Sequence, residues 1–554
     1  MRRDLDRLTA RSFDVLVVGG GIYGLTIACD GAARGLTVAL IERGDFGSGS
    51  SFNHLRTIHG GLRYLQSFNL SRARESVRER RTLARIAPHA VSVLPFALPL
   101  FRALLTGKTA MRTGLLLDRL VAADRNAGVP AERHLPAGRV ISKEEAIRRF
   151  PGLRRQGMTG AAVWHDYITP ESDRLTFAWA TAAVRHGAVI ANYVDAVALV
   201  AETAPAGARV TGVRARDVRT GREIEIGASV IVNATGPAID KLLEPLGVAT
   251  GMPLLKTMNL VTTRDAGGEA ALGGRTRAGK HLFLVPWRSR ALFGTWESSV
   301  RSAHDDVGAR EEEVARFVTQ LNDAFSSLDL TIGDVALVHR GVVPAIVGPE
   351  GALGLEGHEQ VFDHGSGPGG KKRISGLLSV AGTKYTTARG VAERVTDRLV
   401  AALGREAEPC RTADTRLPGG DLEDLALAVS DARREHGNLL PSDTLPHLIA
   451  AYGSAYRDVV DLAAKRPEWR TRLADQSAVV GAELVWAVRE EMAQTLADAV
   501  IRRTPLGALG YPGDAALARA AAIVGDECGW DEGRRREEAG RVRDFYGTSK
   551  ALNT

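Results

Sequence analysis

The sequence is poor in cysteine, in aromatic side chains and in long apolar runs. Its three cysteines, Cys29, Cys410 and Cys528, lie far apart and form no Cys-x-x-Cys motif. This spacing argues against a disulfide framework and against a zinc site, and we predict no metal ion. So few cysteines suit a reducing cytosol, so we predict a cytoplasmic protein.

Further absences narrow the function classes. No run of about 18 apolar residues occurs, so no membrane-spanning helix is predicted, and the first twelve residues, MRRDLDRLTARS, lack the apolar core of a signal peptide. The net charge of +7 is not gathered into a basic arm with interleaved aromatics, which argues against nucleic-acid binding. It fits an anionic substrate or cofactor, or loose attachment to a membrane surface; an arginine-rich background explains it equally well.

The first motif lies near the N-terminus. Residues 13–18 form a β-rich apolar run that leads directly into Gly19-Gly-Gly21-Ile-Tyr-Gly24. Residues 25–34 predict a helix, and residues 36–41 predict a second strand that ends at Glu42. In such a βαβ unit the glycines allow a tight turn, backbone approach to a pyrophosphate and close helix packing, while the acid accepts from ribose hydroxyls. We therefore predict a dinucleotide site.

Three further segments favour FAD over NAD as the dinucleotide. Residues 43–51 form a glycine- and serine-rich loop, and residues 229–237 and 376–387 each read as a strand that ends in a tight turn. The last turn leads into a helix, whose N-terminus can place N–H groups against the flavin C2 carbonyl. Besides Gly19, Gly21, Gly24 and Glu42, the predicted FAD contacts are Arg43, Ser50, Ser51, Gly60, Gly61, Ala234, Gly236, Gly382, Thr383 and Thr386.

Four motifs, in order and in spacing, resemble those of the FAD-dependent glycerol-3-phosphate dehydrogenases, which are D-amino-acid-oxidase-like flavoproteins. They are IHGGLRYL at 58–65, NATGP at 233–237, GTKYTT at 382–387, and EEMAQTLAD at 490–498 with RRT at 502–504. The resemblance spans residues 13 to 546. It implies FAD, hydride transfer from C2 of sn-glycerol 3-phosphate to flavin N5, dihydroxyacetone phosphate as product, and a quinone or oxygen as electron acceptor.

The expected fold class is α/β: a Rossmann-like FAD-binding domain with a mixed-sheet substrate domain, plus a C-terminal all-α domain. The oxidoreductase region is placed at 12–415, with FAD-binding parts at about 12–70, 185–250 and 335–400 and a substrate domain at about 71–184 and 251–334. The helical domain is placed at 416–546, with helices near 446–464, 482–495 and 515–528. We expect an exposed loop at 356–373. Residues 90–120 are apolar with scattered basic residues; we favour a loop-and-helix piece of the substrate domain over contact with a bilayer.

Catalysis requires a base for the hydroxyl proton and cations for a phosphate group. The candidate cations are Arg56, Arg63, Arg340 and Lys384, and the candidate base is His59, which serves equally well as a brace for the backbone. A homodimer and peripheral attachment to the inner face of the cell membrane are both compatible with the sequence.

The substrate region departs from the family pattern. The family's Lys-Gly-x-His appears as Lys256-Thr-Met-Asn259, its Gly-Thr-Thr-Asp as Gly294-Thr-Trp296-Glu297, and its Gly-Val-Arg-Pro-Leu as Gly341-Val-Val343-Pro-Ala345. Two alternatives to the dehydrogenase therefore stay open: an FAD oxidoreductase of the same fold acting on another alcohol or amine, and a non-catalytic flavin-binding scaffold.

Overall fold

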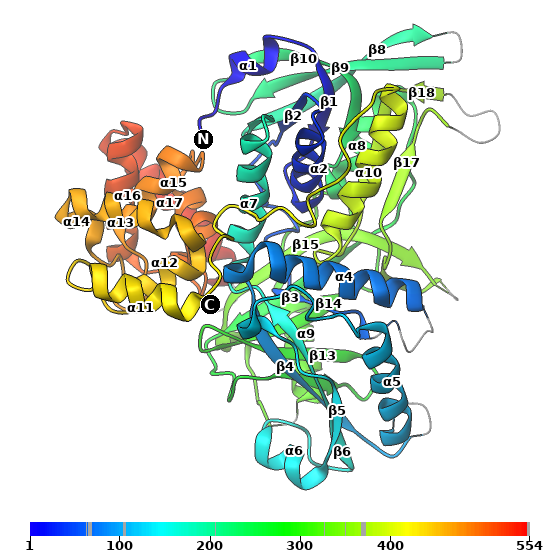
Figure 1. Cartoon of the computed structure of the whole chain (residues 1–554), viewed down its shortest axis with the longest axis vertical. Helices are drawn as coiled ribbons and strands as arrows, with labels where there is room; N and C mark the ends of the chain where they lie inside the picture. Colours follow the sequence, from blue (N-terminus) through cyan, green and yellow to red (C-terminus); the bar gives the residue numbers. More distant parts are fainter. Residues whose placement is uncertain are drawn as a thin grey trace.

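The protein is built from two large sheets and a helical domain (Figure 1). The computed structural model describes residues 1–62, 64, 69–103, 107–204, 207–325, 327–348, 351–366 and 373–550. In Figure 1 the first sheet and its helices lie at the top, the second sheet lies below, and the C-terminal helices, yellow to red, lie to one side. The predicted fold class is confirmed.

The first sheet has the order β17-β19-β10-β1-β2-β7, and the five strands from β19 to β7 run parallel. Its strands are β1 (Phe13–Val18), β2 (Val38–Ile41), β7 (Val189–Ala191), β10 (Glu223–Asn233), β17 (Gln360–Asp363) and β19 (Leu377–Ala381). The long β10 continues into an antiparallel meander with β8 (Val194–Ala204) and β9 (Gly207–Asp217), to which β18 (Arg373–Ser375) adds. The predicted loop at 356–373 is therefore wrong where β17 pairs with β19, because a glycine-rich composition concealed a short edge strand. Residues 367–372 of that segment lie outside the described residues.

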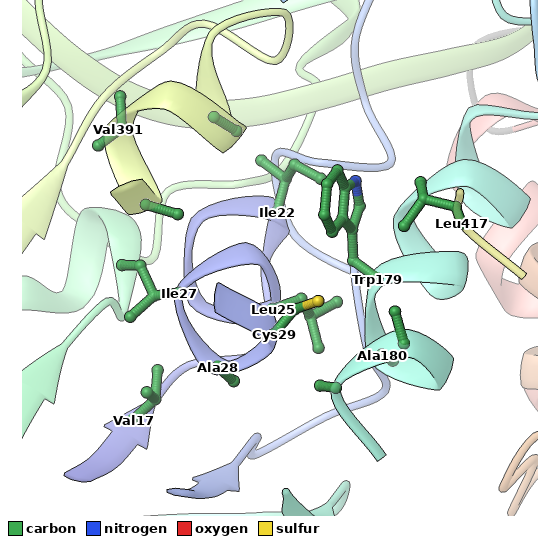
Figure 2. Packing of buried hydrophobic residues seen from close by; sticks show 14 of the residues in the cluster. Val17, Ile22, Leu25, Ile27, Ala28, Cys29, Trp179, Ala180, Val391 and Leu417 are labelled. Carbon is green, nitrogen blue, oxygen red and sulfur yellow. The ribbon is translucent and has the colours of Figure 1, made fainter. Parts of the chain in front are cut away.

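The helix that follows the glycine turn packs between two helices from later in the chain. Figure 2 shows α2 (Ile22–Ala33) with Leu25 and Cys29 turned toward Trp179 of α7 (Ser172–Arg185), and Val391 of α10 (Ala388–Leu403) on its other side. All of these side chains belong to one buried cluster. Helix α7 thus packs on the first sheet's helices, although it lies in a stretch that we had predicted for the substrate domain.

The second sheet has the order β16-β15-β11-β14-β13-β12-β4-β6-β3, with β5 paired to β6. Its strands are β3 (Thr57–Ile58), β4 (Ser92–Leu100), β5 (Arg139–Ser142), β6 (Gly160–Ile168), β11 (Leu254–Thr262), β12 (Ala271–Arg275), β13 (His281–Trp287), β14 (Arg290–Glu297), β15 (Val335–Val347) and β16 (Leu353–Leu355). Helix α9 (Glu311–Ala324) packs on one face, and C-terminal helices cover part of the other. Helices α4 (Leu70–Ile86), α5 (Lys108–Val121) and α6 (Lys143–Arg149) flank the sheet. In the segment 90–120, the helix of the expected loop-and-helix piece is α5, but residues 92–100 form the strand β4 rather than a loop, and residues 104–106 lie outside the described residues.

The C-terminal region is helical, as predicted. It contains α11 (Leu425–His436), α12 (Thr444–Tyr452), α13 (Tyr456–Lys465), α14 (Pro467–Arg470), α15 (Gly481–Glu490), a π-helix (Asp498–Arg503), α16 (Asp514–Cys528) and α17 (Glu532–Lys550). The single helix expected at 446–464 is wrong. Gly453 breaks it with φ +57, and a Cβ there would lie 1.9 Å from the Gly419 carbonyl oxygen. Within the described ranges no helix is both long and apolar enough to cross a membrane.

Candidate functional site

The glycine turn after β1 leaves no room for side chains. Gly19 has φ +109, and a Cβ on it would lie 2.5 Å from the carbonyl oxygen of Ala234 at the end of β10. A Cβ on Gly24 would lie 1.9 Å from the Gly19 oxygen, so α2 packs directly on the turn. Gly21 is the N-cap of α2 and offers no side-chain cap. The partial positive charge at the start of this helix is therefore directed at the turn, as a pyrophosphate site requires.

Glu42 borders the same turn from the end of β2. Its two carboxylate oxygens accept from the backbone N–H groups of Gly20 and Gly44, each at 2.7 Å. Burial raises the pKa of Glu42 above its usual value, and the two N–H groups partly offset this rise. Each oxygen keeps a second lone pair for a ribose hydroxyl. The side chain of Arg43, next in the chain, is exposed. The glycine turn and this fixed carboxylate together fit the adenosine half of a dinucleotide.

The loop after Glu42 connects the turn to the second sheet. The Ser50 hydroxyl donates to the Val342 carbonyl at 3.0 Å, and the Arg340 backbone N–H donates to the Asn53 side chain at 2.9 Å. The Asn259 amide donates to the Asn53 carbonyl at 3.1 Å. At the other end of the loop's contacts, the Ser51 hydroxyl, next to Ser50, accepts from the first N–H of α2, that of Ile22, at 2.9 Å. Sequence reasoning missed Asn53, which no motif marks.

The turn at 382–387 closes the site from the other side. The Thr383 hydroxyl donates to the Glu356 carbonyl at 2.6 Å, and the Tyr23 hydroxyl of α2 donates to the Lys384 carbonyl at 3.1 Å. Gly382 is required here, because a Cβ would lie 2.3 Å from the Tyr23 hydroxyl. The Lys384 ammonium sits 4.1 Å from the centroid of the Tyr64 ring. This turn therefore brings Lys384 close to the start of α2, which follows the glycine turn. The helix predicted after the turn is α10, which begins at Ala388.

His59 follows β3 and contacts a buried acid. Its Nδ1 lies 3.4 Å from the Asp166 carboxylate, its Nε2 lies 2.7 Å from the Thr57 hydroxyl, and its backbone N–H donates to Thr386 at 3.3 Å. Its side chain is 47% exposed, whereas that of Asp166 is 4% exposed. The His59 ring is thus held in one orientation by its two neighbours and is still accessible from outside.

Asp166 is held in its ionised form. Burial would raise the pKa of Asp166, but the guanidinium of Arg80 on α4 and the neighbouring His59 bring it below its usual value. The carboxylate also accepts from the Gly60 N–H at 2.8 Å. A Cβ on Gly60 would lie 2.2 Å from the Arg80 guanidinium, and Gly61 has φ +79, so the two glycines are needed for this backbone path. Sequence reasoning missed both Asp166 and Arg80, because no motif surrounds either.

Arg56, a predicted cation, is used inside the protein. Its side chain is 1% exposed; it donates to the Ser172 hydroxyl at 2.7 Å and lies 3.2 Å from the Asp173 carboxylate. Its guanidinium carbon sits 4.3 Å from the Trp287 ring centroid. This environment balances the charge of Arg56 before any substrate arrives. Arg63, a further candidate, lies outside the described residues.

Arg340 lies on the wrong face of β15 to replace an arginine at position 343. Arg340 pairs with Met258 of β11 and shares its face, which is the face that packs on α9. Val343 shares the opposite face with Gly341, where a Cβ would lie 3.1 Å from the Ser50 hydroxyl. The face that meets the loop at residues 42–53, which we call the cofactor loop, therefore carries Val343. The predicted substrate contact by Arg340 is not favoured by this geometry.

Two further residues of the family pattern, the retained Lys256 and the departure Asn259, are built into the packing. Lys256 is fully buried on the α9 side, with its ammonium 3.1 Å from Glu313 and 2.9 Å from Asp306. The side chain of Asn259, on the opposite face, accepts from the Thr295 hydroxyl at 2.9 Å. Lys256 is thus structural, whereas Asn259 contributes to the surface that meets the cofactor loop. In the described parts of the chain, no group of three or more His, Cys, Asp or Glu side chains is arranged to hold a metal ion.

Comparisons with known proteins agree with this geometry. A family model described as FAD dependent oxidoreductase matches residues 14–398, and one described as the C-terminal domain of alpha-glycerophosphate oxidase matches residues 410–535. A glycerol-3-phosphate dehydrogenase of Mycobacterium leprae is 31% identical over 533 residues, covering 95% of this chain and 86% of its own. The chain belongs to the FAD-dependent glycerol-3-phosphate dehydrogenase family.

Other members of the family extend the similarity. The glycerol-3-phosphate dehydrogenase of Synechocystis sp. is 29% identical over 545 residues, covering 96% of this chain and 95% of its own. The crystal structure of the glycerol-3-phosphate dehydrogenase from Bacillus halodurans, complexed with FAD, superposes with a TM-score of 0.75 at 24% identity, over 98% of this chain and 96% of that one. The prediction of an FAD-dependent enzyme of this family is confirmed, and FAD is its cofactor.

Proposed function

We propose that the chain oxidises sn-glycerol 3-phosphate to dihydroxyacetone phosphate and passes the electrons to a quinone or another acceptor. The observation that carries this proposal is that the 42–53 loop joins the start of α2 to one face of the second sheet, while the 382–387 turn contacts both α2 and His59. Relatives named as glycerol-3-phosphate dehydrogenases match nearly the whole chain, which supports the substrate. Bound FAD supplies the hydride acceptor at N5.

His59 is the proposed base. With Nδ1–H donating to the Asp166 carboxylate, Nε2 is the nitrogen that takes a proton. It accepts from the Thr57 hydroxyl at 2.7 Å, so the proton of the substrate hydroxyl reaches the ring directly or through Thr57. The ionised Asp166, held by Arg80, stabilises the imidazolium that results.

Lys384 is the proposed substrate cation. It is half-buried in the 382–387 turn, whose backbone is held by hydrogen bonds through Tyr23 and Thr383, and its ammonium lies over the Tyr64 ring. Either the substrate oxygen or its phosphate is a suitable partner for this charge. Arg56 acts on the site only through its field, because its guanidinium is paired with Asp173.

A second candidate function is oxidation of a different alcohol or an amine by the same fold, and Val343 is the observation that favours it. An arginine at this position would face the cofactor loop, and a charge-assisted hydrogen bond to phosphate contributes about 1.5–3 kcal/mol. The two functions differ in which compound bleaches the flavin anaerobically. Bleaching by glycerol 3-phosphate but not by glycerol supports the first; bleaching only by other alcohols or amines supports the second. No bleaching by any compound supports a non-catalytic scaffold.

Peripheral membrane contact is a further proposal, and α5 supports it. Arg112, Leu116, Arg119 and Leu120 lie on its exposed side, and the two leucines are 57% and 67% exposed. Apolar side chains flanked by arginines suit the surface of an anionic bilayer. Co-sedimentation with anionic vesicles tests this, with Leu116→Ser/Leu120→Ser as the variant; binding that the variant leaves unchanged contradicts a role for α5.

A further inference from the structure

Two arginines of the C-terminal domain form ion pairs with Asp45 of the cofactor loop. Asp45 lies three residues after Glu42, in the loop that borders the glycine turn. Its carboxylate accepts from Arg503 twice, at 2.7 Å each, and from Arg502 at 2.7 Å. The Asn192 amide completes the shell at 3.1 Å. The side chains of Asp45 and Arg503 are 0% and 1% exposed, so an interdomain ion pair is fully enclosed.

The arginines are themselves fixed. Arg503 donates to the Glu491 carbonyl at 3.1 Å and lies 4.2 Å from the Phe177 ring of α7, while Arg502 also pairs with Asp498. Both arginines belong to the π-helix, an element that is often found at functional sites. Burial would raise the pKa of Asp45, but Arg503 and Arg502 bring it below its usual value, so the carboxylate stays charged.

Asp45 is mechanically linked to the glycine turn. The Gly47 N–H donates to the Gly20 carbonyl at 2.9 Å, and the Ser48 N–H donates to the Asp45 carbonyl at 3.1 Å. Phe46 lies against Gly20, where a Cβ would come within 2.7 Å of its ring. The path of residues 44–48 over the turn is thus set on one side by Gly20 and on the other by Arg502 and Arg503.

We propose that Arg502 and Arg503 are positioning residues for FAD: through Asp45 they hold the 42–51 loop in the conformation that binds the cofactor. Without these two arginines the loop becomes ordered only when FAD binds, and the free-energy cost of ordering it weakens FAD binding. Because coupling between two sites is reciprocal, FAD must in turn strengthen the docking of the 498–503 segment. This role of the two arginines concerns the affinity for FAD and does not depend on which substrate is oxidised.

The test compares two buried ion pairs. Arg503→Gln removes the pair to the cofactor loop, whereas Lys256→Gln removes the pairs to Glu313 and Asp306, at 3.1 and 2.9 Å, which lie on the α9 side of the second sheet, away from that loop. Dissociation of FAD from each purified holoenzyme on dilution is followed by flavin fluorescence. We expect Arg503→Gln to raise the Kd for FAD by about tenfold or more, and Lys256→Gln to change it by less than about threefold even if both lower the unfolding temperature. Equal effects on Kd, or none for Arg503→Gln, overturn the proposal.

A measurement on the unaltered protein covers the case in which Arg503→Gln does not fold. Amide hydrogen exchange of residues 494–504 is compared between the holoenzyme and protein from which FAD has been removed. We expect faster exchange in this segment without FAD, with little change in α16. Identical exchange in the two states overturns the proposal. The milder Arg502→Gln, which leaves the two bonds from Arg503 in place, is expected to raise the Kd by a smaller factor than Arg503→Gln.

Discussion

Restoring an arginine at position 343 tests how this chain recognises phosphate. Val343 is half-buried on β15, on the face shared with Gly341 and directed at the cofactor loop. An arginine at that position projects its guanidinium from the sheet face toward the site. We therefore expect Val343→Arg to improve oxidation of glycerol 3-phosphate.

The expected magnitude follows from one charge-assisted contact. Such a hydrogen bond contributes about 1.5–3 kcal/mol, and about 1.4 kcal/mol corresponds to a factor of ten. The kcat/KM for glycerol 3-phosphate should thus rise by about 10- to 150-fold. Glycerol, which has no phosphate, should gain nothing.

The assay is steady-state turnover with an artificial dye as electron acceptor, after flavin content has been matched between proteins. Val347→Arg is the control: it adds the same charge on the same strand face four residues further on, where the side chain is 49% exposed. A flavin-loaded Val343→Arg protein with no gain for the phosphate ester, or with an equal gain for glycerol, refutes the reasoning.

Four further outcomes are expected. Lys384→Ala should slow anaerobic flavin reduction by about 10- to 150-fold with FAD still bound, and Lys384→Arg should be less impaired; wild-type reduction kinetics in the alanine variant contradict the proposed role. Asp166→Asn should lower kcat, removing part of the factor of about 10²–10⁴ that a general base supplies, and an unchanged kcat argues against His59 as the base. Gly24→Ala should yield protein with little bound flavin, because its Cβ would lie 1.9 Å from the Gly19 oxygen; a full flavin-to-protein absorbance ratio contradicts this. Burial lowers the pKa of His89 from 6.5 to about 3, so the unfolded chain takes up a proton that the folded chain does not. Stability should therefore fall as the pH drops from about 6.5 toward 3, by up to ~1.4 kcal/mol per unit, and His89→Asn should flatten the pH dependence of the unfolding midpoint.

The cofactor half of the site could be predicted from local sequence. The turn at Gly19 to Gly24 and the acid at Glu42 follow one another within a single βαβ unit, so their spacing alone carries the geometry. The turn around Lys384 was recognisable for the same reason. In both segments the strand, the turn and the polar group are neighbours in the chain.

The substrate half depends on contacts between distant segments. Whether Arg340 faces the site is decided by its pairing with Met258, which a sequence does not reveal. The partners of His59 and Arg56 are likewise acids more than 100 positions away, Asp166 and Asp173. Residue type suggested charge at each position; the strand register and the packing of α7 decide which charges are already paired.

The strand order of the first sheet has a consequence for biosynthesis. The β1–α2–β2 unit is complete at residue 41, but β1 pairs with β10, and β10 pairs with β19, which ends at residue 381. At about 5–20 residues per second a ribosome needs roughly 17–68 s to add the intervening 340 residues. Until β10 is complete at residue 233 the glycine turn has an open strand edge on one side, and throughout the interval it lacks the 382–387 turn that closes it. The flavin can therefore be captured in its complete site only after most of the chain has been made, which makes cofactor loading a late event in the synthesis of the protein.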